Sequence, residues 1–94
     1  MPRPRNRRNI GFTPEVTYFK PQGIPLRELE KVTLSFTELE AMRLINIEEM
    51  DQQEAAKQMN ISQSTLFREL KEARKKIALA LINGKAIKIE KNNQ

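Results

Sequence analysis

Residues Asp51–Ile77, DQQEAAKQMNISQSTLFRELKEARKKI, carry the strongest structural signal in this chain. They contain two amphipathic segments separated by a short break around Asn60. Asp51 is suited to begin the first helix, and Asn60 tolerates the left-handed conformation that ends one. Ser62 is suited to begin the second helix. The stretch therefore predicts two helices joined by a tight turn, an arrangement that is typical of proteins that read DNA.

The apolar residues of both segments indicate which faces are buried. In the first segment they are small (Ala55, Ala56 and Met59), as expected where two helices cross closely. In the second they recur at steps of four, three and four, at Leu66, Leu70, Ala73 and Ile77. Phe67 falls on the flank of this face, and we expect it to pack at the rim of the core.

The side of the second helix opposite its apolar face is polar and basic, with Ser64, Arg68, Lys71 and Lys75. Arginine can bind guanine, and glutamine adenine, with two hydrogen bonds each. A solvated helix could show the same charged face, but the spacing, the caps and the turn favour DNA binding. We therefore predict contacts to base edges from Gln63, Ser64, Thr65 and Arg68, and contacts to phosphates from Lys71 and Lys75.

The composition of the chain argues against several classes of function. The chain has 94 residues, a net charge of +5, and neither cysteine nor histidine. These absences remove thiolate metal sites and the usual general base, so we expect no metal, no cofactor and no enzyme activity. No apolar run approaches membrane-spanning length and no signal-peptide core is visible, so we expect a cytoplasmic protein without membrane association.

Charge is unevenly distributed along the chain. Residues 1–31 carry seven basic and three acidic residues, residues 32–62 two and six, and residues 63–94 eight and three. Residues 1–11 are predicted to be a flexible basic arm, because prolines interrupt its arginines Arg3, Arg5, Arg7 and Arg8. Beside a DNA-reading helix, such an arm favours contact with a minor groove or with phosphates; the alternative is a solubilising tail.

Residues 12–94 are predicted to form one domain. A short strand is expected at 16–19 and a helix from Ser35, where Ser35 and Glu38 form a capping box. The expected inner face of that helix is Leu39, Met42 and Ile45, and residues 47–50 link it to the helix pair. Residues 85–90 alternate like a strand that could pair with residues 15–19 of its own chain or of a second copy.

The run 78–82, ALALI, is apolar nearly all round, so one side of it should bury in its own domain and the rest should contact a partner. Paired half-sites also strengthen weak DNA readout. We therefore expect a homodimer.

Several motifs carry a resemblance to a known family. They are PRPR at 2–5, FKPQGIP at 19–25, LEAMRL at 39–44, EAA at 54–56, ISQST at 61–65 and NGKA at 83–86. Together they resemble a family of short uncharacterised prokaryotic proteins that are predicted to bind DNA. Many of its members carry cysteines after the N-terminal arginines, where this chain has Ile10 and Gly11, so no metal- or redox-sensing role is expected here.

Residues 34–77 are also similar to the promoter-reading C-terminal region of sigma factors. This resemblance implies a three- to four-helix domain with a sigma-like helix-turn-helix at 51–82. Together with the short N- and C-terminal β segments expected from the residue patterns, it predicts a mainly α fold. The resemblance also implies that residues 63–71 lie at the groove.

Two functions follow as the main hypotheses. The first is a transcriptional regulator that binds double-stranded DNA through the major groove. The second is an adaptor of the transcription machinery that contacts protein, for instance RNA polymerase, without sequence specificity of its own. RNA binding is less favoured, because few aromatic residues are available to stack on bases.

Overall fold

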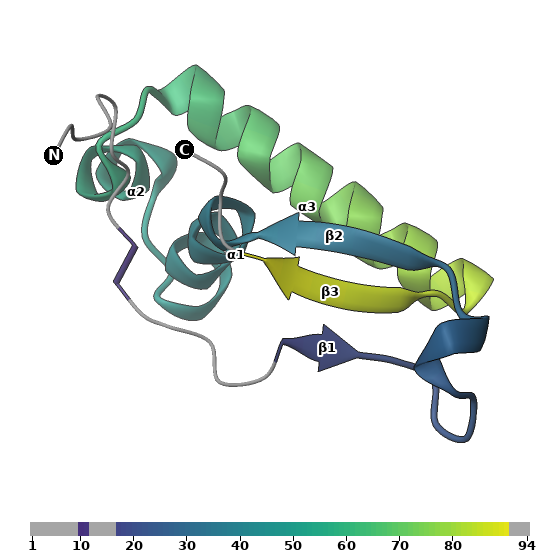
Figure 1. The fold of residues 1–94 in the computed structure, drawn as a ribbon. Coiled ribbons are helices and arrows are strands. Elements are labelled where there is room, and N and C mark those ends of the chain that lie inside the picture. The colour runs from purple at the N-terminus through teal and green to yellow at the C-terminus, as the bar shows by residue number, and fades with distance from the viewer. Residues whose placement is uncertain (1–9, 12–16, 91–94) are drawn as a thin grey trace, which may run out of the picture.

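A computed structural model of the chain describes residues 10–11 and 17–90, which form three helices and a three-stranded sheet (Figure 1). The helices are α1 (Phe36–Met42), α2 (Gln52–Met59) and α3 (Gln63–Asn83). The strands are β1 (Tyr18–Phe19), β2 (Lys31–Ser35) and β3 (Ala86–Glu90). A 3-10 turn, η1 (Leu26–Glu28), precedes β2, and a π-helical turn, η2 (Arg43–Ile47), extends α1. The expected mainly helical fold with short β segments is confirmed.

Side-chain caps define where each helix begins. The backbone N–H of Glu38 donates to Ser35 Oγ (3.0 Å) and that of Ser35 donates to Glu38 Oε1 (3.0 Å), which completes the predicted capping box. Asp51 caps α2, and Ser62 Oγ accepts from the N–H of Thr65 at 3.1 Å to cap α3. Asn60, with φ of 60°, ends α2 in the left-handed conformation. The local signals in the sequence therefore locate the helix boundaries correctly.

The sheet has the order β1-β3-β2. The strand β3 pairs antiparallel with β1 of the same chain. This confirms one of the two pairings predicted for residues 85–90. The strand β3 also pairs in parallel with β2, a strand that was not predicted. Lys31–Ser35 is a short run that ends on the cap of α1, and its partner strand lies at the other end of the chain, so local sequence carries little information about it.

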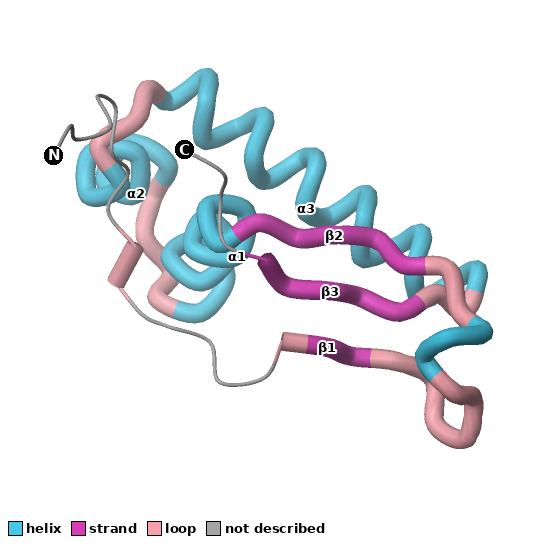
Figure 2. The backbone as a smooth tube through the Cα atoms, viewed as in Figure 1, coloured by secondary structure: helices cyan, strands magenta, loops and turns pink. Residues whose placement is uncertain are grey.

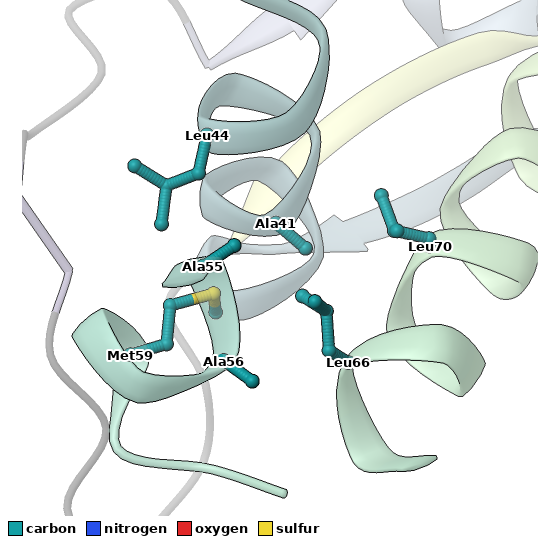
Figure 3. Close-up of a cluster of buried hydrophobic side chains, with 7 residues drawn as sticks. All are labelled: Ala41, Leu44, Ala55, Ala56, Met59, Leu66 and Leu70. Carbon is teal, nitrogen blue, oxygen red and sulfur yellow. The ribbon is translucent and has the colours of Figure 1, made fainter. Parts of the chain in front are cut away.

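One hydrophobic cluster joins α1, α2 and α3 (Figure 3). Its fully buried members converge from the three helices: Ala41, Leu44, Ala55, Ala56, Met59, Leu66 and Leu70. The two alanines of α2 let its backbone approach the other helices closely, as their small side chains predicted. This cluster fixes the position of α2 relative to α3.

A second cluster joins α3 to the sheet. It consists of Leu34, Ala73 and Ile89, with Ile77 and Ile87 packed against it. Figure 2 shows the strands at one end of the molecule and α2, with the start of α3, at the other. Because α3 contributes to both clusters, one continuous helix connects the two ends of the fold.

The residues predicted for the inner face of the first helix do pack against the two clusters, but they are not its most buried residues. Leu39, Met42 and Ile45 are only half-buried, whereas Ala41 and Leu44 are fully buried. The reason is that α1 packs between the helix cluster and the sheet cluster, so more than one of its sides is covered.

Two acidic side chains of α1 are buried as well. Glu38 accepts two hydrogen bonds from Lys76 Nζ, at 2.9 and 3.0 Å, and Glu40 is bound by Arg43. Burial of a carboxylate is tolerated because each has a cationic partner.

The position of Phe67 was predicted wrongly. Its side chain is 54% exposed rather than packed at the core rim. It follows Leu66 by about 100° around the helix, which turns it away from both clusters.

We expect Leu66→Ala to lower the free energy of unfolding by about 2–5 kcal/mol, because it opens a cavity between three helices. Phe67→Ala, one position along the same helix, should change that free energy by less than about 0.5 kcal/mol, because Phe67 is exposed. Urea denaturation followed by circular dichroism measures both. Equal losses for the two variants would contradict the packing of α3 described above.

Candidate nucleic-acid interface

The first half of α3 presents the predicted polar residues on one exposed face. Ser64, Arg68, Lys71 and Lys75 are all exposed. At 100° per residue they fall within a sector of about 60°, on the side opposite Leu66 and Leu70. Ser64 and Lys75 are about 16 Å apart along the axis, at 1.5 Å per residue. The structure therefore brings these four predicted side chains together on one surface.

The start of α3 holds a network of hydroxyl groups. Ser62 Oγ caps the helix, donates to Thr65 Oγ1 at 2.9 Å and lies 3.2 Å from Ser64 Oγ. Arg68 Nη2 donates to Thr65 Oγ1 at 3.3 Å. Thr65 is half-buried, and its hydroxyl oxygen accepts hydrogen bonds from both Ser62 Oγ and Arg68 Nη2. The contact with Thr65 orients Arg68 along the first turn of the helix, where Gln63 is also exposed.

The cations of α3 fall into two groups. Lys76 forms an ion pair with Glu38, and Arg74 Nη2 donates to Asn46 Oδ1 at 3.4 Å. Both side chains therefore bind other elements of the fold. Lys71 and Lys75 form no ion pair with another residue in the described part of the chain. Their ammonium groups therefore have full charge available for an anionic partner.

Arg74 is a further candidate residue that was not predicted from the sequence. It is exposed and lies two turns after Phe67 on the same flank of the polar face, so it widens the basic surface. Its contact with Asn46 depends on the packing of η2 against α3, and no local sequence signal indicates that packing.

The predicted arm lies almost entirely outside the described residues, and so do Arg3, Arg5, Arg7 and Arg8. Its last two residues, Ile10 and Gly11, are described. The backbone N–H of Gly11 donates to Glu40 Oε2 at 2.9 Å.

Glu40 also accepts hydrogen bonds from Arg43, at 2.7 Å from Nε and 3.0 Å from Nη2. Hydrogen bonding to Glu40 raises the pKa of Arg43 above its ordinary value, although burial partly opposes this. The guanidinium of Arg43 therefore stays charged throughout the physiological pH range.

Two further features concern metal binding and membrane insertion, and both are stated for residues 10–11 and 17–90. No group of three or more acidic side chains is placed to hold a metal ion there. None of the described helices is long and apolar enough to cross a membrane.

The chemical capacity of this surface is recognition through hydrogen bonds and charge. Its exposed donors are guanidinium, ammonium, amide and hydroxyl groups on a helix whose first turn has no acidic residue. A helix of this diameter fits the major groove of B-form DNA, which is about 12 Å wide. We call the surface formed by Ser64, Arg68, Lys71 and Lys75, with Gln63 on its flank in the first turn, the basic face of α3.

No solved structure is significantly similar to this chain. Three relatives are named only as UPF0251 proteins. The protein of Caldanaerobacter subterraneus subsp. tengcongensis is 53% identical over 93 residues, which is 99% of this chain and 79% of the relative. That of Moorella thermoacetica is 52% identical over 90 residues, or 96% of this chain and 60% of the relative. That of the archaeon Methanosarcina acetivorans is 48% identical over 91 residues, or 97% and 81%.

The similarity to these relatives extends along nearly the whole of this chain, but their names state no activity. A family profile described as protein of unknown function DUF134 matches residues 1–93. The chain therefore belongs to the DUF134, or UPF0251, family of uncharacterised prokaryotic proteins.

Proposed function

We propose that this protein binds double-stranded DNA with the basic face of α3 in the major groove and that it regulates transcription. The observation that carries the proposal is the grouping of Ser64, Arg68, Lys71 and Lys75 on one exposed side of a helix. The opposite side of that helix is buried by α1 and α2. In this arrangement α2, the turn 60–62 and α3 act as a helix-turn-helix similar to that of sigma factors.

The position of each side chain suggests its role. Arg68 lies near the start of α3 and is oriented by Thr65, so we assign it to a base edge. Gln63 and Ser64 lie in the first turn and are assigned to bases as well. Lys71 and Lys75 lie further along the helix and are assigned to phosphates, where a mobile point charge is sufficient.

A second function is favoured by one specific observation. Phe67 is 54% exposed and lies on the flank of the same half of α3. An exposed aromatic residue beside basic side chains is also suited to bind a protein, such as RNA polymerase. In that case the protein would act as an adaptor of the transcription machinery.

We also propose that the protein is a cytoplasmic homodimer. The last turn of α3 leaves Leu81 75% exposed and Ile82 81% exposed, whereas Ala80 is buried against the rest of the fold. Adjacent apolar side chains of this size on a surface are typical of a contact site. A two-fold dimer would present two basic faces to successive half-sites on the DNA.

Selection from a randomised duplex pool at several salt concentrations tests the main proposal. A sequence-specific regulator should enrich a defined motif, and a dimer should enrich a two-fold repeated one. Salt-sensitive binding without enrichment would indicate binding to the backbone alone. If no duplex binds at low salt, the adaptor function replaces DNA binding.

Arg68→Ala should weaken binding to a selected site by about 1–3 kcal/mol and relax the preference at one base pair, because a bidentate contact to a base is lost. Fluorescence anisotropy with the selected duplex and its single-base variants measures this effect. A uniform loss across all variants would assign Arg68 to the phosphate backbone instead.

Lys75→Ala should weaken binding to every duplex by a similar factor and reduce the slope of log affinity against log salt by about 1. Lys31→Ala is the matched control, since it removes an equal charge from an exposed position at the start of β2, outside the basic face of α3. The same slope change in both variants would show that net charge, rather than the basic face, determines the salt dependence.

Replacing Leu81 and Ile82 together by Asp should convert a dimer into a monomer in sedimentation equilibrium, because the charged side chains oppose burial. Ile47→Asp changes a side chain that is 72% exposed in η2 and should leave the dimer intact. A wild-type protein that is monomeric at all concentrations tested would overturn the dimer proposal.

A further inference from the structure

Glu40 connects the N-terminal segment to the helical core. Its side chain is buried, with the residue only 1% exposed, and it accepts three hydrogen bonds. Two come from Arg43 in η2, and the third comes from the backbone N–H of Gly11, 29 residues earlier in the chain. The described segment 10–11 consequently lies beside α1, on the side of the molecule where Figure 1 shows α2 rather than the sheet.

The hydrogen bond from Gly11 is not needed to balance the charge of Glu40. The guanidinium of Arg43 already binds both carboxylate oxygens, in the bidentate geometry that is strongest for this pair. The contact with Gly11 therefore acts mainly on the N-terminal segment, which it fixes to the core.

The same contact requires a residue without a side chain. A Cβ atom added to Gly11 would lie 2.9 Å from Arg43 Nη2 and 3.3 Å from Glu40 Oε2. Arginine side chains can often move away from such an atom. Here Arg43 is held by Glu40, so movement would break the bidentate pair. A larger side chain at position 11 should therefore displace the segment rather than the arginine.

The position of this attachment determines where the basic arm can reach. The length of chain between Gly11 and Arg8 allows a reach of at most about 10 Å, and that between Gly11 and Arg3 at most about 28 Å. Without the attachment, the next described contact is at Thr17, whose carbonyl accepts from the N–H of Ile89 at 2.8 Å in the sheet. That adds about 20 Å of chain and moves the point of attachment to the sheet end of the molecule.

We propose that Gly11, Glu40 and Arg43 form an anchor that holds the basic arm at the α2 end of the fold. From there the arm contacts the DNA that flanks the segment bound by α3. This inference rests on the proposed DNA binding and adds positioning residues to it. By shortening the tether, the anchor raises the effective concentration of the arginines at the flanking DNA.

The test compares two duplexes, one that ends at the segment contacted by α3 and one extended by a flank. Gly11→Val should weaken binding to the extended duplex by about three- to tenfold, because the tether becomes longer, and leave binding to the short duplex unchanged. Its melting temperature should stay close to that of the wild type, since the Arg43–Glu40 pair is retained.

A second set of variants shows whether the anchor acts through the arm. Replacing the arm arginines by Gln should also remove the advantage of the flank, and adding Gly11→Val should then have little further effect. The matched control neutralises Arg27 and Lys31, which are exposed near β2, and should preserve the advantage. The substituted arm positions are Arg3, Arg5, Arg7 and Arg8.

The outcomes separate the two proposals. If the wild type binds both duplexes equally, or if Gly11→Val retains the advantage of the flank, the anchor has no role in binding and the proposed function stands. If the wild type binds neither duplex at low salt, both proposals are wrong.

Discussion

The fold depends on the burial of one side of α3 by two separate hydrophobic clusters. Leu66 and Leu70 pack against α1 and α2, whereas Ala73 and Ile77 pack against the sheet. A helix held at both places has a fixed direction and a fixed rotation about its axis. The position of every other exposed side chain on α3, including those of the basic face, follows from that rotation.

The two clusters divide α3 into regions with different properties. Near α2 its exposed side is basic and rich in hydrogen-bond donors, and its first turn has no acidic residue. Near the sheet its last turn exposes apolar side chains instead. This separation is compatible with one helix that binds an anionic partner at one end and another protein at the other. Two buried carboxylates of α1 connect it to other segments: Glu38 forms an ion pair with Lys76 of α3, and Glu40 accepts a hydrogen bond from Gly11.

Patterns within a few residues were sufficient to predict much of this structure. The caps at Ser35, Asp51 and Ser62, the left-handed Asn60 and the apolar spacing of α3 all act locally, so they can be identified without the fold. Phe67 was predicted wrongly for the opposite reason. A residue on the flank of a helix is buried or exposed according to which neighbour covers that flank, and here none of the described elements does so.

The helix boundaries, the buried face of α3 and the residue types of the basic face follow from local sequence, because they depend on periodicity and on capping within single turns. Other contacts arise only when distant segments pack together. The strand β2 exists because β3 returns beside it, Arg74 is oriented by η2, and Gly11 meets a carboxylate from α1. Each of these contacts joins segments far apart in the chain, and their geometry depends on the packing of α1 between two clusters. No local pattern contains that information.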